Sequence, residues 1–271
     1  MLLSLVLVSL TVKQDDNGQL CLTRCLAWAT FIRDTLSLKS LDECAANISV
    51  SHPTSFYMRY KLLSFLEEAL KEGELLEGIV EADETYALVS QKGVPVTVRK
   101  PSKTTTKRNF SDEQMYICVA TDREGRIVAR CVNQAKPTAD NIQEALGVRI
   151  GENGVFLCDG ATAYNRLIET KNCQKIVLNN HKDYNKAYHL NTVNGLHSRL
   201  KAMLYRYRGV SSKYLNRCLA LFTALEQAGR FVFHPEIDSV RQMIDKVNAS
   251  DISESCPQRR FWHFDKQVQI V

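Results

Sequence analysis

The chain has 271 residues, of which 45% are hydrophobic and 24% are charged, and these values exclude wholesale disorder. Its length allows one or two domains. The formal net charge is +5, but the charge is concentrated, because residues 171–217 contain ten basic residues and a single acid, Asp183. Such a segment indicates either a polyanionic partner or the solvated face of a helix.

The cysteines and the N-terminal stretch limit the class of protein. The nine cysteines are an odd number and form no CxxC pair, which favours free thiols in a reducing cytosol over a disulfide framework. Residues 1–10 are apolar, but the stretch is too short to span a bilayer and lacks the features of a signal peptide. We therefore expect residues 1–20 to form an atypical N-terminal segment, either a buried strand or the result of a misplaced start codon.

Residues 21–74 have helical patterns. Ser40 and Glu43 form a capping box before a short helix over 41–47. Ser51 predicts the start of a longer helix, which tolerates Pro53 in its first turn and ends at Gly73. The short helix, the turn and the longer helix predict a helix-turn-helix that binds DNA, although a plain helical hairpin has the same pattern.

From residue 77 the pattern changes to that of a sheet. Residues 78–90 predict a strand, and residues 114–132 predict two strands joined by a tight turn. Further strands are predicted over 154–159 and 175–179, and helices over 138–146, 161–170, 192–206 and 211–229. Three consecutive strands followed by alternating helices and strands predict a mixed α/β sheet.

Two segments outside the predicted sheet carry basic residues. The loop 98–109 either contacts phosphate or serves as a solvated linker. Its basic side chains are Arg99, Lys100, Lys103, Lys107 and Arg108. Residues 230–271 form a C-terminal tail of unknown role, in which basic and aromatic residues at 259–264 either pack or stack on DNA.

Two carboxylates stand out in apolar strands. Asp83 lies within the first predicted strand, and Asp159 ends the strand before a helix. Buried carboxylates at neighbouring strand positions repel each other unless a cation lies between them, and Mg²⁺ prefers such oxygen ligands. The alternative is that each carboxylate caps a helix or pairs with an arginine.

The long predicted helix over 192–206 offers a third group. Asn194, His197 and Lys201 have the spacing i, i+3 and i+7, so they share one helix face. Asn194 has an amide oxygen that can bind a metal ion, whereas His197 and Lys201 can contact phosphate.

Four segments taken in order resemble the successive motifs of bacterial insertion-sequence transposases of the DDE type, in which the third acid is Glu in many members and Asn in others. These segments are EADETY (81–86), VFLCDGATAY (155–164), HLNTVNGLHSRLK (189–201) and RGVSSKYLNRCL (208–219). Residues 40–63 resemble the helix-turn-helix of the same group.

The resemblance implies an RNase H-like catalytic domain over 77–229, a mixed sheet flanked by helices, preceded by a helix-turn-helix domain over 21–74. The group usually carries an N-terminal zinc ribbon with two CxxC pairs, and this sequence has no counterpart of it.

The resemblance also implies metal-dependent cleavage and strand transfer on DNA. Asp83, Asp159 and Asn194 are then the catalytic ligands of two Mg²⁺ ions, for which Mn²⁺ can substitute. Residues expected to hold backbone phosphates are Lys201, His197 and Arg199. Residues expected to contact the terminal inverted repeats are Thr54, Ser55 and Arg59.

The expected partners are double-stranded DNA, both the terminal inverted repeats and the target, and further copies of the chain in a synaptic complex. This activity would place the protein in the cytoplasm at the nucleoid. Because the zinc ribbon is missing, a second hypothesis is a truncated, inactive remnant that only binds DNA. A third hypothesis is a nuclease of the same fold.

Overall fold

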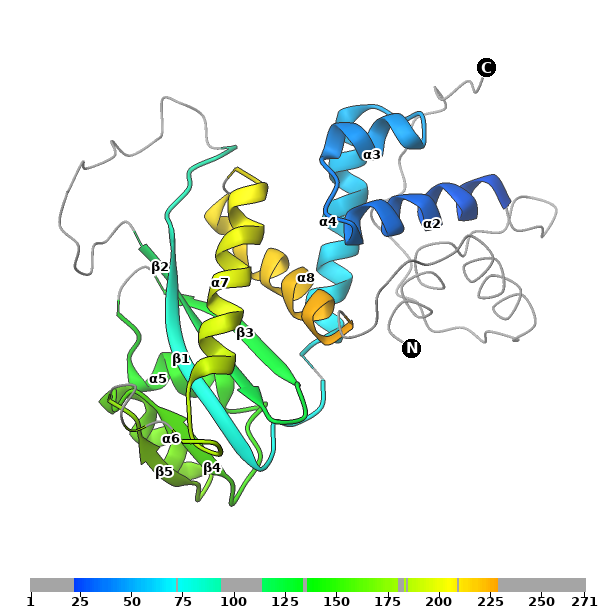
Figure 1. Ribbon diagram of the computed structural model, residues 1–271. Coiled ribbons are helices and arrows are strands. Elements are labelled where there is room, and N and C mark those ends of the chain that lie inside the picture. The colour runs from blue at the N-terminus through cyan, green and yellow to red at the C-terminus, as the bar shows by residue number, and fades with distance from the viewer. Residues whose placement is uncertain are drawn as a thin grey trace. The chain divides into compact units, whose positions relative to one another are not determined.

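The structure is a computed structural model, which describes residues 22–71, 73–93, 114–133, 136–179, 183, 185–208 and 210–228. Three helices precede a five-stranded sheet, and further helices cover that sheet (Figure 1). The segment 1–20, the basic loop 98–109 and the tail 230–271 lie outside the described residues. Within the described part of the chain, the helices are too short or too polar to cross a membrane.

The N-terminal helices begin where the sequence predicts. They are α2 (Leu22–Leu36), α3 (Leu41–Asn47) and α4 (His52–Ala69). The predicted capping box is confirmed, because Glu43 N donates to Ser40 Oγ and Ser40 N donates to Glu43 Oε2 (3.2 and 2.8 Å). Ser51 caps α4 by accepting from Thr54 N. The helix ends before the predicted Gly73, with Leu70 as its C-cap.

The sheet has the strand order β3-β2-β1-β4-β5. Its strands are β1 (Ile79–Leu88), β2 (Gln114–Asp122), β3 (Ile127–Asn133), β4 (Val155–Cys158) and β5 (Gln174–Val177). Strand β2 is antiparallel to both β1 and β3, whereas β4 runs parallel to both β1 and β5. The predicted RNase H-like mixed sheet is therefore confirmed.

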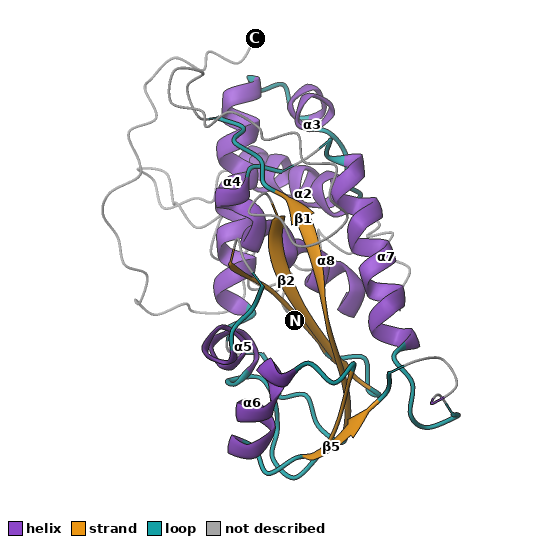
Figure 2. Ribbon diagram, turned by 90° about the vertical axis from the view of Figure 1, so that its left-hand side faces the viewer, coloured by secondary structure: helices purple, strands orange, loops and turns teal. Residues whose placement is uncertain are grey.

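Helices cover both faces of this sheet (Figure 2). On one face lie α7 (Asn191–Arg206) and α8 (Leu215–Ala228), and on the other lie α5 (Ala139–Leu146) and α6 (Asn165–Thr170). Alternating side chains of β2 serve the two cores: Ile117 packs on the α7 and α8 side, and Cys118 packs on the α5 and α6 side. Short 3-10 turns, η2 (Thr162–Tyr164) and η4 (Ser212–Tyr214), begin two of the predicted helices.

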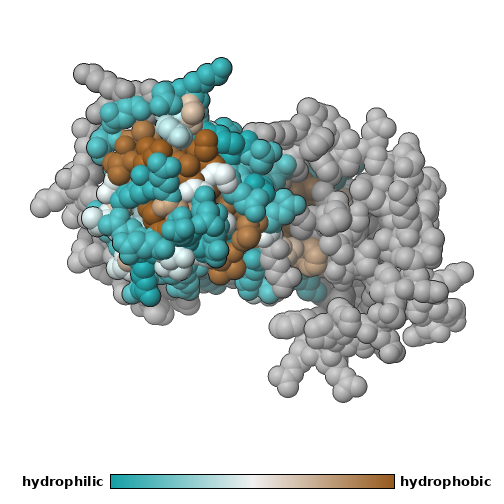
Figure 3. All heavy atoms as spheres, turned by 90° about the horizontal axis from the view of Figure 1, so that it is seen from below, coloured by the Kyte–Doolittle hydropathy of each residue, from teal (hydrophilic) through white to brown (hydrophobic). Residues whose placement is uncertain are grey.

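The described cysteines are unpaired, and some apolar side chains of the outer strand reach the surface. Every cysteine whose side chain the structure describes is a free thiol. The four-residue strand β5 ends in Val177, which stays 39% exposed. A view from below Figure 1 shows apolar residues reaching the surface between polar ones (Figure 3). Exposed apolar residues of this kind are ordinary on folded proteins.

Arg149 joins the helical segment to the sheet. Its guanidinium is buried and donates to two backbone carbonyls just after α4: Nη1 lies 2.5 Å from Leu70 O, and Nη2 lies 2.8 Å from Glu74 O. The backbone continues the contact, because Leu76 N donates to Arg149 O at 2.7 Å. Burial lowers the pKa of this guanidinium. The side chain and the backbone of Arg149 thus both hold the connection between α4 and β1.

Replacement of this side chain tests the connection. Arg149→Met removes the donors and leaves the two carbonyls of Leu70 and Glu74 without them, so we expect the free energy of unfolding to fall by about 2–4 kcal/mol. Urea denaturation measures this change. Arg166→Met is the matched control, because the Arg166 side chain is 60% exposed and pairs with the exposed Asp140. We expect it to cost less than about 1 kcal/mol. Equal losses in the two variants would contradict the role of Arg149.

Candidate active site

Two adjacent parallel strands bring Asp83 and Asp159 together. The register pairs Glu81 of β1 with Leu157 of β4, so two residues further on Asp83 lies beside Asp159. Asp159 comes directly after β4, where Gly160 takes a φ of +92° that disfavours other residues. Asp159 Oδ1 accepts from Ala161 N at 3.0 Å, which orients the carboxylate. The predicted proximity of the two acids is therefore present in the fold.

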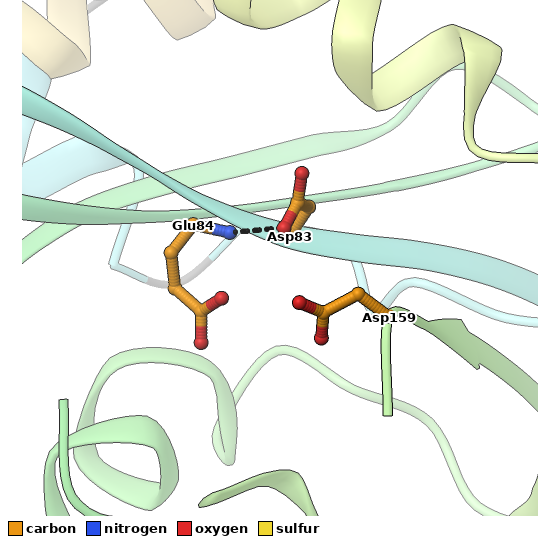
Figure 4. Close-up of side chains that lie close together, drawn as sticks. All are labelled: Asp83, Glu84 and Asp159. Carbon is orange, nitrogen blue, oxygen red and sulfur yellow. Dashed lines mark hydrogen bonds between the residues drawn. The ribbon is translucent and has the colours of Figure 1, made fainter. Parts of the chain in front are cut away.

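A third carboxylate, Glu84, joins them (Figure 4). One oxygen from each of Asp83, Glu84 and Asp159 lies within 4.8 Å of the others. Sequence reasoning missed Glu84, because alternation along a strand sends neighbouring side chains to opposite faces. Asp159 lies beyond the end of its strand and is near both. The signal that could have identified Glu84 is the pair of adjacent acids, Asp83 and Glu84, in an apolar strand.

Burial and mutual repulsion shift the titration of Asp83 and Glu84. Burial, with the negative charge of Asp159 as a further contribution, raises the pKa of Asp83 to about 6. Burial and the charge of Asp83 raise the pKa of Glu84 to about 7. Three crowded carboxylates with only oxygen donors suit a hard divalent cation such as Mg²⁺ or Mn²⁺, which would remove the repulsion.

Helix α7 lies over Asp83. His197 Nδ1 is 3.8 Å from Asp83 Oδ2, and the imidazole is buried. Burial, together with the nearby Lys201, lowers the pKa of His197 to about 4, so this side chain is neutral at pH 7. The ring lies beside Asp83, and the expectation that His197 contacts a phosphate stays a prediction, now for an uncharged imidazole.

The other predicted residues of α7 have different surroundings. Asn194 is exposed and lies one helical turn before His197, and its role as third ligand stays a prediction. Lys201 is exposed one turn after His197, with Nζ 5.4 Å from the centre of the Tyr86 ring, and its charge lowers the pKa of Asp83. Of these two side chains, Lys201 lies close enough to the acids for its charge to act on Asp83.

Arg199 joins α7 to α8. Its Nε lies 2.9 Å from both carboxylate oxygens of Glu226 on α8, and its side chain is 54% exposed. The expected contact of Arg199 with a phosphate stays a prediction.

Glu81 fixes the beginning of α7. This carboxylate is fully buried in β1, and Oε2 accepts from the backbone amides of Thr192 and Val193, both at 3.0 Å. Oε1 accepts from Thr192 Oγ1 at 2.8 Å and from the Arg123 guanidinium, and His189 Nδ1 lies 3.2 Å away. Amides at the start of a helix have no partner within the helix, and a carboxylate also interacts favourably with the helix dipole there.

The position of Glu81 matters for the acids. It lies two residues before Asp83 on the same strand, so it faces the same side of the sheet. By holding the first turn of α7, Glu81 also sets the position of His197 and Asn194 relative to Asp83. Sequence reasoning did not single out this residue, because its partners on α7 lie more than 100 residues away.

Two of the three residues expected to contact the inverted repeats are buried between the N-terminal helices. Ser55 is fully buried and donates to Leu41 O at 2.9 Å. Arg59 is 9% exposed and donates to Lys39 O at 2.7 Å. Both fix α4 against the preceding chain, so the structure corrects their assignment as base contacts. Thr54 is half-buried at the first turn of α4. The basic side chains at 99, 100, 103, 107 and 108 lie outside the described residues.

Comparisons with known proteins give a family and a few distant structures. The profile of a family described as ISXO2-like transposase domain matches residues 75–223, which is more than half of the chain. The mariner Mos1 paired end complex with Mg is 17% identical, covers 88% of this chain and 80% of that chain, and has a TM-score of 0.32.

Two further structures are more distant in sequence. A pre-cleavage Mos1 transpososome is 14% identical, covers 81% of this chain and 78% of that chain, and has a TM-score of 0.31. The intasome of simian T-cell lymphotropic virus is 11% identical, covers 84% of this chain and 71% of that chain, and has a TM-score of 0.29. No curated protein matches the sequence.

The raised pKa of Asp83 predicts a pH-dependent stability. The unfolded acid ionises near pH 4 and the folded one near pH 6, so above pH 6 the ionised carboxylate destabilises the fold. Asp83→Asn should therefore raise the free energy of unfolding at pH 8 in EDTA, by up to about 3 kcal/mol. This gain should disappear as the pH falls from 6 to 4.

Urea denaturation across this pH range checks the expectation. We also expect Mg²⁺ to stabilise the parent at pH 8 and to stabilise Asp83→Asn much less. Asp140→Asn, at an exposed acid away from the cluster, should behave as the parent. A loss of stability at pH 8 in Asp83→Asn would show that burial does not strain this carboxylate.

Glu81→Gln tests the link between β1 and α7. The carboxamide loses the charge that Arg123 and the two amides require, and we expect the free energy of unfolding to fall by about 3–5 kcal/mol. Hydrogen exchange at the first turn of α7 should become faster. Glu226→Gln is the matched control, since Glu226 also pairs with an arginine but at the surface, and it should change both measurements little. Slow exchange in Glu81→Gln would refute the role of Glu81.

Proposed function

The chain belongs to the ISXO2-like transposase domain family, and from this premise we propose that it cleaves the ends of an insertion sequence and joins them to target DNA. The single observation that carries the proposal is the pair Asp83 and Asp159 on adjacent parallel strands beneath α7. Family membership gives the transposase class, and the pair of acids supports a catalytic rather than a purely DNA-binding protein.

The acids fit divalent metal ions. We propose that Asp83 and Asp159 bind two Mg²⁺ ions, which Mn²⁺ can replace, and that Asn194 is the third ligand. When bound, such ions make a water molecule or a hydroxyl group a better nucleophile and stabilise the leaving oxygen. Glu84 is a second candidate for the third ligand, because its carboxylate already lies with the other two.

The chain's own groups orient the DNA. Lys201, which is exposed one turn beyond His197, would bind a backbone phosphate next to the acids. The neutral His197 would keep the Asp83 carboxylate in place without adding a charge. No side chain is needed as a nucleophile, because the attacking groups are water and the 3′-hydroxyl of the cleaved strand.

The proposal includes partners. Double-stranded DNA would bind as inverted repeats at the transposon ends and as target, with the helical segment 21–74 as a helix-turn-helix domain and 77–229 as the catalytic domain. Two or more copies of the chain would hold paired ends in a synaptic complex. Solved structures that resemble this chain distantly include paired end and strand transfer complexes of Mos1. The protein would act at the nucleoid, where its substrate is.

A strand-transfer assay tests the chemistry. Duplexes that carry the inverted repeats flanking the gene are incubated with Mg²⁺ or Mn²⁺ and a target plasmid, and joined products are counted. We expect Asp83→Ala and Asp159→Ala each to lower joining by roughly 100-fold or more, because several kcal/mol of transition-state stabilisation are lost. Asp140→Ala is the control outside the cluster. Joining that survives in the first two variants would contradict the assignment, and a parent that binds the ends without joining them would favour the inactive remnant.

The same assay separates the two candidates for the third ligand. Loss of joining in Asn194→Ala with activity kept in Glu84→Gln would support Asn194. The opposite result would assign the position to Glu84 and would overturn the sequence prediction.

A further inference from the structure

A cavity of about 510 Å³ lies between helix α4 and the chain around η4 and α8, away from the acid cluster. This volume is within the range of about 300–1,000 Å³ that is usual for sites of small molecules. Three α4 residues spaced as on one helix face, Phe56, Tyr60 and Leu63, contribute to its lining. Tyr214 of η4 also lines the cavity and packs against the first two of these rings.

The walls carry aromatic rings that a ligand can contact. The rings of Tyr60 and Tyr214 meet edge to face, with 5.8 Å between their centres and an angle of 88°, and the centre of the Phe56 ring is 6.1 Å from that of Tyr214. Phe56 and Tyr60 remain 36% and 38% exposed, which is unusual for large rings at a packed junction. Rings that are exposed inside a cavity offer faces on which a planar group can stack.

Cations accompany these rings. The Arg217 guanidinium lies 4.0 Å from the centre of the Tyr60 ring, and Lys213 Nζ lies 4.6 Å from the centre of the Tyr214 ring. Arg59 and Lys92 also line the cavity, and none of the described residues that line it is acidic. Glu67 contacts Arg217 from outside the cavity at 3.5 Å. The lining therefore favours an anionic occupant.

Three buried polar atoms of the lining residues have no hydrogen-bond partner among the described residues. They are Nε of Arg59, a side chain that is 9% exposed, the hydroxyl of Tyr207, and Nε of Arg217, which lies 3.5 Å from a carboxylate oxygen of Glu67. Buried donors of this kind are rare unless a ligand or water completes them. They add polar groups to an aromatic lining.

We propose that this cavity binds an unpaired nucleotide of a DNA strand, with the base against Tyr60 and Tyr214 and its phosphate near Lys213 and Arg217. Aromatic rings combined with cations are the usual means of binding single-stranded DNA, because every base has a face that can stack. Bases inside a duplex are covered by their neighbours, so only an unpaired nucleotide fits. The inference depends on the proposed function in taking DNA as the substrate, but it uses no residue of the acid cluster.

Binding measurements in EDTA test this inference. Fluorescence anisotropy compares a blunt duplex with the same duplex carrying a short overhang of unpaired thymidines. We expect the parent to bind the overhang duplex about tenfold more tightly, and Tyr214→Ala to lose this preference. Tyr214→Phe keeps the ring and should keep the preference.

The matched control is Tyr205→Ala, because Tyr205 is 87% exposed on α7 and does not line the cavity, and it should bind as the parent. If Tyr214→Ala does not fold, as its melting curve would show, Lys213→Met gives a second reading. It should lower the slope of log Kd against log salt by about one for the overhang duplex only.

Two results would overturn the inference: a parent without preference for the overhang, or a preference that Tyr214→Ala retains. If Tyr214→Ala retains the preference and also changes its molecular mass, the cavity is assigned to a second copy of the chain. Failure to bind either duplex would overturn the proposed function as well, whereas equal binding of the two duplexes would leave that function intact.

Discussion

The buried carboxylate of Glu81 determines how the two halves of the active site meet. Strand β1 carries Asp83, and helix α7 carries His197 and Asn194, but the two elements are more than 100 residues apart in the chain. Glu81 joins them by accepting hydrogen bonds from the first backbone amides of α7. The start of α7 is therefore fixed to β1 two residues before Asp83. A charge buried at this position is costly unless all its partners are present. Correct placement of α7 is thus coupled to correct formation of the sheet.

Two kinds of carboxylate therefore lie on one strand. Glu81 is saturated with donors from Arg123 and the helix, and it serves the fold. Asp83 and Glu84 have few donors, and burial raises the pKa of each. The strain of keeping these acids together in the metal-free protein is what a divalent cation would relieve, so the same residues that lower stability would provide affinity for the ion.

The sequence predicted those features that depend on local or regular patterns. The capping box of Ser40 and Glu43, the hairpin of β2 and β3 and the neighbouring positions of Asp83 and Asp159 follow from spacing and from the parallel order of strands. Features set by distant packing were not predictable. Arg59 has the position of a surface residue on a DNA-reading helix, yet its guanidinium turns inward to Lys39 O. Similarly, no local signal shows that His197 is buried or that Arg199 pairs with Glu226.

The connection made by Arg149 has a consequence for the distance along DNA between the proposed recognition and cleavage positions. Arg149 holds the end of α4 to the sheet, and Glu67 of α4 contacts arginines of both β3 and α8. Because of these contacts, α4 is fixed relative to the sheet. Under the proposed function, α4 would read DNA at a constant distance from Asp83 and Asp159. The packing of α4 would then set the number of base pairs between the recognised sequence and the cleaved bond.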